Sequence, residues 1–437
     1  MQPVLTDESS ALDEAAFKQQ LEKMGLDTAL PMALAVSGGA DSMCLAFLAK
    51  GMNVKALVVD HGLRPESCSE AALTVERLEA IGVDAEILTW VHDDVPTSNI
   101  QAAAREARYA LMARKCRDLG IATLLTAHHM DDQAETFLLR LNRGSGLAGL
   151  TGMAEKRELE AGLTLVRPLL SYRKAALVDV LKRHSVEWIE DPSNTNETFD
   201  RVKARQLLAD PPLTGLTAPR LAHTAYALGR ARRAIEHYVF RWLDEAVEFA
   251  EAGYASFGAC HLREAPDEVG LRALAHLIRF ASGQPYGPRF EKLVRLYDGL
   301  LSPDFSGTTL SGARFLPLEQ GGILVLREIA ATERAAIAHI SVWDGRYGVN
   351  KKSDADLDGL EVGCLDEDGL AQLKSATDAG LEMPRAAALS APGYFMGDKL
   401  IAVPHLGYGA SNKKLPVLTH RWLTSSESGK KTYRGVQ

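Results

Sequence analysis

Short apolar runs alternate with longer amphipathic stretches over the first third of the chain. Four runs rich in Val, Leu and Ala fit buried strands at 33–36, 54–59, 85–88 and 122–126. Helical spacing is found at 42–50, 70–81, 100–119 and 131–143. Parallel strands joined by right-handed helical crossovers explain this order. The pattern predicts an α/β fold whose ligands bind beyond the carboxyl ends of the strands.

The segment before the first strand has a helical pattern of its own. Phe17 and Leu21 lie four residues apart, and Gly25 follows as a helix stop. We expect a lead-in helix within residues 1–30 and a parallel-sheet nucleotide-binding domain over residues 31–212.

A break at 210–212 separates this domain from a long helix that is predicted to begin near Thr217. Apolar residues recur every seven positions in the helix, and basic residues fall on a different face. The apolar seam consists of Leu221, Leu228, Ile235 and Trp242, and the basic face of Arg230, Arg233, His237 and Arg241. We expect a mainly helical accessory domain at 217–330. For its basic face, RNA contact and plain solvation both stay open.

The C-terminal quarter changes character again. Short segments there are interrupted by Gly, Asp and Pro, and some are apolar, such as 400–403. This predicts a small mixed or mainly β domain at 335–437. Its last 27 residues hold six basic residues and one acid, which fits either a floppy tail or an RNA contact.

Composition is that of a globular protein, with 46% hydrophobic and 24% charged residues. No run approaches the roughly 20 apolar residues of a membrane helix, and acids stand where a secretory signal would carry basic residues. The five cysteines include no CxxC pair, so neither a disulfide framework nor a zinc or iron–sulfur site is predicted. We expect a cytoplasmic protein whose net charge of -8 restricts RNA contact to local basic patches.

The most informative chemical signal is a glycine-containing run between the first strand and its helix. It reads Ser37-Gly38-Gly39-Ala40-Asp41-Ser42. Glycines allow a tight turn, the helix N-terminus offers unpaired amide hydrogens, and two serines add hydroxyl donors, so the run can hold a phosphate. Asp41 would repel that phosphate unless a bridging Mg²⁺ binds both. An ordinary glycine turn with a Ser or Asp cap is the alternative.

This run resembles the SGGxDS phosphate loop of the N-type ATP pyrophosphatases, which have an adenine nucleotide alpha hydrolase-like fold. Further blocks resemble the transfer-RNA isoleucine lysidine synthetase family in order and spacing. They lie at 59–65, 104–109, 129–136, 143–153, 167–170 and 188–194. The resemblance implies that ATP with Mg²⁺ activates the wobble cytidine of isoleucine transfer RNA with a CAU anticodon, and that free L-lysine is then ligated to it. Oligomeric state is not determined by the sequence, and a homodimer is one option.

Asp132 and Glu135 form a candidate amine site. They lie three residues apart, so they share one face of a predicted helix at the mouth of the sheet. By themselves they could also be solvated acids in a first helical turn. The resemblance implies that they hold the substrate lysine.

Three further side chains gain a catalytic role only from the resemblance. Arg108 by itself is either an exposed helix arginine or a phosphate ligand, and His129 a loop or capping histidine. The resemblance implies that Arg108, His129 and Arg205 act together with Asp41. One departure concerns 201–205, which reads Arg-Val-Lys-Ala-Arg where many relatives have Arg-Asn-x-x-Arg.

Gly144, Gly146 and Gly149 read as GxGxxG. The run follows a predicted helix and not a strand, so a dinucleotide site is not predicted. The resemblance implies that this loop faces the cytidine and the adenylate. A surface loop without that role is the alternative.

Three other functions fit the sequence less well. A thiolating RNA enzyme of the same superfamily would need the cysteine pairs that are missing. A glutamine-dependent amidotransferase would need an N-terminal catalytic cysteine, and none is present. A noncatalytic nucleotide- or RNA-binding module would have little use for the complete set of Asp41, Arg108, Asp132 and Glu135.

Overall fold

The chain forms two compact units, which divide between Arg232 and Arg233. The computed structural model describes residues 12–91, 100–160, 162–190, 200–351, 357–377, 381, 383–410, 412, 414–425 and 431–433. Three parts of the sequence analysis lie outside these ranges: the first eleven residues of the predicted lead-in segment, positions 191–194 of the block at 188–194, and Lys413, Lys430 and Arg434 of the basic C-terminal segment.

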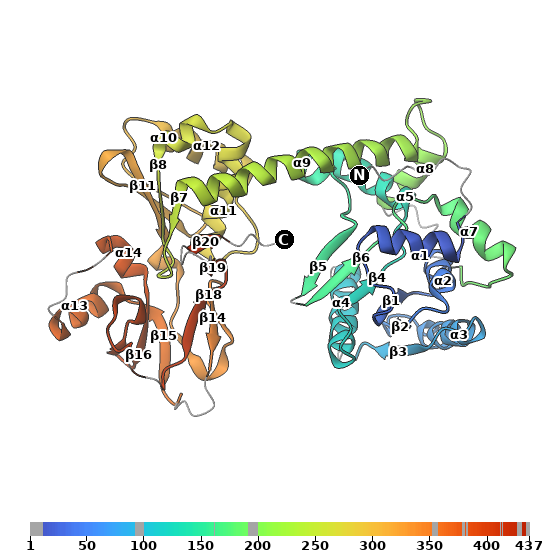
Figure 1. Cartoon of the computed structure of the whole chain (residues 1–437), viewed down its shortest axis with the longest axis horizontal. Coiled ribbons are helices and arrows are strands. Elements are labelled where there is room, and N and C mark those ends of the chain that lie inside the picture. Colours follow the sequence, from blue (N-terminus) through green and yellow to red (C-terminus); the bar gives the residue numbers. More distant parts are fainter. Residues whose placement is uncertain are drawn as a thin grey trace. The chain divides into compact units, whose positions relative to one another are not determined.

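The first unit contains a six-stranded sheet (Figure 1). Its strands are β1 (Met32–Val36), β2 (Val54–Asp60), β3 (Ala85–Thr89), β4 (Thr123–Leu125), β5 (Lys156–Glu160) and β6 (Leu163–Val166). They lie in the order β3-β2-β1-β4-β6-β5, and all neighbours are parallel except β5, which pairs antiparallel with β6. The four predicted parallel strands are confirmed. The hairpin of β5 and β6 was not predicted.

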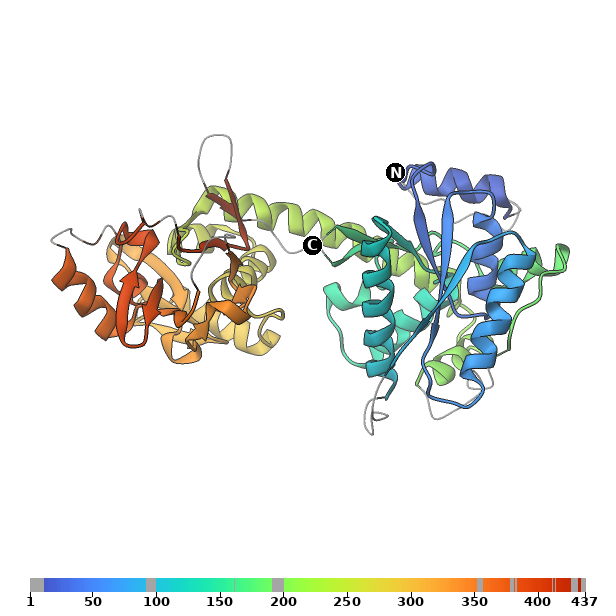
Figure 2. The ribbon, with the colours of Figure 1, turned by 90° about the horizontal axis from the view of Figure 1, so that it is seen from below.

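Helices cover both faces of this sheet (Figure 2). The helices of this part of the chain are α1 (Glu14–Lys23), α2 (Ala40–Ala49), α3 (Ser67–Ala80), α4 (Ile100–Asp118), α5 (Met130–Asn142), α6 (Leu147–Leu150), α7 (Lys174–Arg183) and α8 (Asp200–Ala209). The core on one face takes its side chains from α1, α2, α3 and α7, and the core on the other face from α4. No helix in the described part of the chain is long and apolar enough to cross a membrane.

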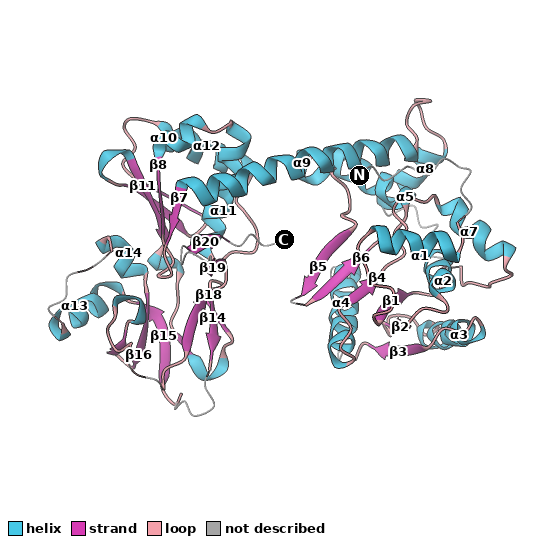
Figure 3. Ribbon diagram, in the orientation of Figure 1, coloured by secondary structure: helices cyan, strands magenta, loops and turns pink. Residues whose placement is uncertain are grey.

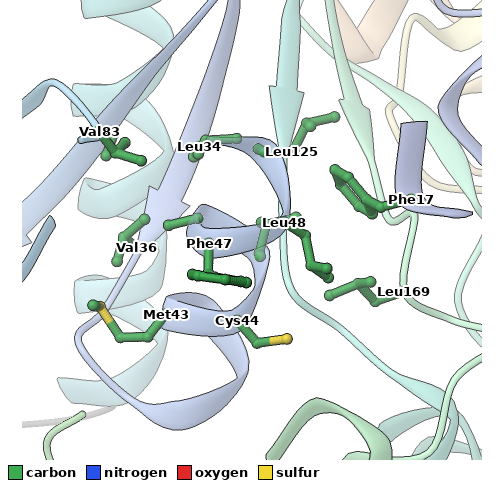
Figure 4. Packing of buried hydrophobic residues seen from close by; sticks show 14 of the residues in the cluster. Phe17, Leu34, Val36, Met43, Cys44, Phe47, Leu48, Val83, Leu125 and Leu169 are labelled. Atoms are coloured by element: carbon green, nitrogen blue, oxygen red, sulfur yellow. The ribbon is translucent and has the colours of Figure 1, made fainter. Parts of the chain in front are cut away.

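Helix α2 lies deep in the core because nearly all of its surface is apolar. Met43, Cys44 and Leu48 are fully buried. Phe17 of α1 is also fully buried and packs in the same cluster, which Figure 4 shows from close by. The lead-in helix is thus part of the core that fixes the start of α2, and α1 ends before Gly25 as predicted.

Helix α9 (Ala218–Ala246) runs from the first unit into the second. Leu221 and Leu228 of the predicted seam pack against Phe137 of α5 in the first unit. Ile235 and Trp242 pack in the main core of the second unit. The predicted apolar seam is therefore confirmed as a packing surface.

The second unit begins with a five-stranded antiparallel sheet packed against helices (Figure 3). The strands are β7 (Val247–Phe249), β8 (Ala255–Gly258), β9 (Thr308–Leu310), β10 (Ala313–Pro317) and β11 (Gly322–Arg327), in the order β7-β8-β11-β10-β9. The helices are α10 (Ala259–Glu264), α11 (Asp267–Ser282) and α12 (Phe290–Leu301). Helices were predicted for this region, and the sheet was not.

Small sheets and two helices make up the rest of the second unit. The strands are β12 (Ala335–Ala336), β13 (Val342–Trp343), β14 (Tyr347–Asn350), β15 (Leu360–Cys364), β16 (Pro392–Met396), β17 (Lys399–Ala402), β18 (Val417–His420), β19 (Leu423–Ser425) and β20 (Lys431–Tyr433). The helices are α13 (Asp366–Ala376) and α14 (Arg385–Ser390), with 3₁₀ turns η2 (Glu319–Gly321), η3 (Ile329–Ala331), η4 (Ile337–His339) and η5 (Pro404–Leu406). The apolar run at 400–403 contributes most of β17.

Candidate active site

The predicted phosphate loop connects β1 to α2 at the carboxyl edge of the sheet. Gly38 has a φ of 82°, and a Cβ at this position would collide with Thr74 Oγ1. Ser42 Oγ accepts a hydrogen bond from the Ser37 amide at 3.1 Å and donates one to the Gly39 carbonyl at 3.0 Å, which closes the turn. No side chain caps α2, so its first-turn amide hydrogens are available to an anion.

Asp41 lies in the first turn of α2, and its two carboxylate oxygens have different surroundings. Oδ2 is 3.5 Å from His129 Nε2 and 3.8 Å from Lys174 Nζ, whereas Oδ1 is buried without a hydrogen-bond partner. Burial raises the pKa of Asp41, but His129, Lys174 and Arg205 outweigh this effect and hold the pKa below its ordinary value. The carboxylate is therefore ionised at neutral pH and has one oxygen available to a cation.

This arrangement fits Mg²⁺ bound together with a nucleotide. Mg²⁺ is commonly held by one or two carboxylates, with phosphate and water oxygens completing its shell. Among the described residues there is no group of three or more His, Cys, Asp or Glu side chains that could hold a metal ion without such help. Asp41 beside a phosphate loop supplies the expected single carboxylate.

His129 links the phosphate loop to α5. It is buried, caps α5, and its Nδ1 accepts a hydrogen bond from the Asp132 amide at 3.4 Å. Its Nε2 lies 3.5 Å from Asp41 Oδ2 and 3.5 Å from Asp132 Oδ2. Burial lowers the pKa of His129, but the Asp41, Asp132 and Asp131 carboxylates outweigh it and leave the pKa above its usual value. The Nε2 atom thus lies between Asp41 of the predicted phosphate site and Asp132 of the predicted amine site.

Asp132 and Glu135 are not equivalent. The Asp132 side chain is 18% exposed, whereas that of Glu135 is 2% exposed. Glu135 Oε1 accepts a hydrogen bond from Arg205 Nε at 2.9 Å, and Oε2 lies 3.8 Å from Arg201 Nε. The two arginines that match the family pattern at 201–205 therefore neutralise Glu135, and Asp132 is the more accessible acid.

Arg108 is half-buried on α4. Burial lowers its pKa, and its positive charge lowers the pKa of His61, which follows β2. Its Cζ lies 5.5 Å from the centre of the Tyr109 ring. The structure thus places Arg108 near the end of β2, and it brings Asp41, His129, Asp132, Glu135 and Arg205 together in one cluster of contacts.

A side chain of α5 fixes the backbone of the glycine loop that contains Gly144, Gly146 and Gly149. Arg140 Nη1 donates hydrogen bonds to the carbonyls of Gly149 at 2.7 Å and Gly152 at 2.8 Å. Gly144 has a φ of 69°, and Gly146 precedes the short helix α6. The run is therefore an ordered turn joined to the helix that carries the acids.

Comparisons with known proteins agree with this geometry. The PP-loop domain family matches residues 12–211. The tRNA(Ile)-lysidine synthase of Ruegeria pomeroyi is 35% identical over 418 residues, which cover 92% of this chain and 92% of that protein. The chain belongs to the tRNA(Ile)-lysidine synthase family.

Two more members of the tRNA(Ile)-lysidine synthase family match most of the chain. That of Wolbachia pipientis is 35% identical and covers 72% of this chain and 76% of its own length. The synthase of Hyphomonas neptunium is 38% identical, and the match covers 69% of this chain and 83% of that protein. The family, the PP-loop α/β fold, the use of ATP and the assignment as a ligase, all predicted from the motif blocks, are thereby confirmed.

Sequence reasoning missed two side chains near the site of this member of the tRNA(Ile)-lysidine synthase family, Lys174 and His128. Lys174 approaches Asp41 from α7, and nothing in its local sequence marks it. His128 was passed over beside His129, although its Nδ1 lies 3.0 Å from Thr126 Oγ1 and burial lowers its pKa to about 4. The doubled histidine was the signal that could have found it.

Proposed function

We propose that this chain ligates L-lysine to C2 of the wobble cytidine in tRNA(Ile) with a CAU anticodon, and forms lysidine with release of AMP and pyrophosphate. The observation that carries the proposal is the position of His129 Nε2, 3.5 Å from both Asp41 and Asp132. A nucleotide on the phosphate loop and an amine at Asp132 would then lie next to each other. Such proximity is what a two-step ligation requires.

In the first step, O2 of the cytidine attacks the α phosphate of ATP, and pyrophosphate leaves. The backbone amides of residues 37–42 and the Ser37 hydroxyl hold the triphosphate, Ser42 fixes the turn of the loop, and Asp41 would hold Mg²⁺. When bound there, Mg²⁺ would offset the negative charge on the triphosphate. Arg108 contributes a further positive charge from the neighbouring end of β2.

In the second step, the ε-amine of lysine attacks C2 of the adenylated base after losing a proton, and AMP leaves with the oxygen that was O2. Asp132 holds the amine, because it is the more exposed of the two acids. Glu135 supports the site mainly by fixing Arg205, whose charge also acts on Asp41 and Asp132. The loop at Gly144, Gly146 and Gly149 encloses the base. A target base must be unstacked, which suits an anticodon loop.

The test is transfer of radiolabelled lysine, with ATP present, to a tRNA(Ile) transcript with the CAU anticodon. The matched control is the methionine tRNA, which has the same anticodon. Label in the isoleucine transcript alone, with one AMP and one pyrophosphate released per lysine, is the expected result. Binding of ATP and RNA without label in RNA would instead favour a noncatalytic module, and sulfur incorporation would favour a thiolating enzyme.

The thiolating alternative has little support in the described residues. All five cysteines are free, and three of them are buried. Burial raises the pKa of Cys44 to about 12 and that of Cys116 to about 11, which suits packing and not sulfur transfer. A cytoplasmic location and a homodimer stay predictions.

A further inference from the structure

Three arginines lie around the ring of Tyr109 in the first unit, and the charge of a fourth, Arg167, interacts with theirs. Arg105 and Arg108 come from α4, Arg157 from the edge strand β5, and Arg167 follows β6. The Cζ atoms of Arg105, Arg108 and Arg157 lie 5.0, 5.5 and 5.8 Å from the ring centre. Together with Arg167 they are called the arginine cluster.

Arg167 is the buried member of the cluster. Its side chain is 5% exposed, its Nη1 donates to the Ala154 carbonyl at 2.6 Å, and its Nε is buried without a hydrogen-bond partner. The pKa of Arg167 is lowered to about 10, mainly by burial and also by the charges of Arg157 and Arg105, against the opposing effect of Tyr109. These charges are therefore close enough to repel one another.

Within the described ranges, no carboxylate forms an ion pair with these arginines. The ion pairs found among the described residues include none with Arg105, Arg108, Arg157 or Arg167. Contact with the Tyr109 ring stabilises each exposed arginine by only about 0.5–1 kcal/mol, which offsets little of the repulsion among the positive charges. Convergent guanidinium groups without acids are typical of sites that bind phosphate.

The cluster lies beside the candidate active site. Arg167 and His128 follow the neighbouring parallel strands β6 and β4, so both lie at the carboxyl edge of the sheet. The pKa of His128 is lowered first by burial and then by Arg167, Arg105 and Arg201, and it is raised by Asp132. The charges of the arginine cluster and of Asp132 therefore both act on His128 at this edge of the sheet.

We propose that Arg105 and Arg157 bind a backbone phosphate of the RNA next to the base that is adenylated, and that the buried charge of Arg167 adds to the attraction. The ligand chemistry is phosphate, which could come from RNA or from the triphosphate of ATP. RNA is favoured because β6 is two strands away from β1 and its phosphate loop, about 10 Å at ordinary strand spacing. The proposal rests on the proposed function for the identity of the RNA.

The test compares Arg105→Ala, Arg157→Ala and their double variant with wild type and with Arg114→Ala. Arg114 is an exposed arginine of the same helix outside the cluster, so its loss matches the change in charge. The probe is the CAU tRNA(Ile) transcript, and its binding is measured as a function of salt concentration. KM values for RNA and for ATP are determined in parallel. Both substituted residues are exposed, so folding is expected to survive, and circular dichroism verifies it.

Each single substitution is expected to weaken RNA binding by about tenfold, because a charged hydrogen bond to phosphate is lost. The slope of log K against log salt should fall by about one for each arginine removed, while the KM for ATP stays unchanged. An increase in the ATP KM alone would assign Arg105 and Arg157 to the triphosphate, together with Arg108, and would overturn the proposal. An effect on RNA no larger than that of Arg114→Ala would also overturn it.

Failure of the proposed function gives a different result. If wild type binds the transcript with the expected salt slope but transfers no lysine, the ligase proposal fails, and the binding data still decide whether the cluster holds RNA phosphate. Arg157→Lys provides a further check. It keeps the charge but loses the planar fork, so it should restore most of the salt slope and only part of the affinity.

Discussion

At the scale of single residues, two acids on one face of α5 have different roles because they differ in burial and in their partners. Glu135 is almost fully buried and bound to Arg205, so it cannot accept a substrate amine without leaving a guanidinium unpaired. Asp132 is more exposed and lies against His129. The amine is therefore expected to meet Asp132 first.

Asp132→Asn should raise the KM for lysine by about tenfold or more, because an ionic contact with the ammonium group becomes a neutral one. The KM for ATP should change little. Initial rates of lysine transfer at varied lysine and varied ATP separate the two effects. An unchanged lysine KM would show that the amine binds elsewhere.

Glu135→Gln should behave differently, although the change is equally conservative. Arg205 and Arg201 lose a buried counter-charge, so the variant should unfold at a lower temperature as well as turn over more slowly. Thermal unfolding of the two variants side by side distinguishes a direct ligand from a positioning residue. Equal melting temperatures for Glu135→Gln and wild type would contradict this division of roles.

Asp41→Asn tests the metal role at the phosphate loop. The amide keeps the size of the side chain but removes the charge beside the buried Oδ1 site, so ATP-dependent pyrophosphate release should fall by about 100-fold or more. Asp179→Asn, an exposed acid on α7, is the control. Pyrophosphate release in Asp41→Asn equal to that of wild type would refute the metal role.

At the scale of elements, α5 organises the site. Its N-cap is His129, its first turn holds Asp132, and its later turns bind the backbone of the glycine loop through Gln133 and Arg140. The loop is thus positioned by the same rigid helix that carries the acids. A movement of α5 would therefore displace the glycine loop as well as the acids.

Gln133→Leu should loosen the loop while leaving the phosphate site intact. Gln133 donates to the Met153 carbonyl at 2.9 Å and accepts from its amide at 2.6 Å, so the variant leaves both backbone groups unpaired. We expect the KM for RNA to rise by about tenfold with little change in that for ATP. Gln133→Glu keeps one of the two bonds and should give a smaller effect. Identical RNA kinetics in all three proteins would exclude a role for the loop in binding the base.

At the scale of the whole molecule, histidines packed inside the second unit make its stability depend on pH. In the second unit, burial lowers the pKa of His276 to about 4 and also lowers the pKa values of His405 and His420. These histidines are neutral when folded and can take up a proton when unfolded. Their linkage makes the second unit sensitive to acid.

In His276→Phe, the free energy of unfolding should fall less steeply than in wild type as the pH is lowered. Because its folded pKa lies below its unfolded value of about 6.5, the destabilisation is absent above that pH and grows as pH falls toward 4, by on the order of 2 kcal/mol. Denaturant unfolding of both proteins at pH 7.5, 6 and 5 measures this pH-dependent loss of stability. The exposed His339→Gln is the control. Parallel profiles for His276→Phe and wild type would contradict the assignment.

The elements that sequence reasoning predicted are those with strong local periodicity. The strands at the centre of the first sheet are continuous apolar runs, and their ends were placed within about two residues. The edge strand β5 reads Lys-Arg-Glu-Leu-Glu and has no such pattern. Strand β7 follows α9 without a turn signal, and β9 has three residues, so the five-stranded sheet of the second unit could not be predicted.

The sequence alone determined the phosphate loop, the spacing of the acids on α5 and the family, because each is a local run whose residue types dictate its conformation or chemistry. Only the tertiary structure decided that Arg205 neutralises Glu135, that Lys174 approaches Asp41, and that three arginines meet around Tyr109. These contacts join segments far apart in the chain. They arise from the packing of helices and strands into one core, which no local pattern specifies.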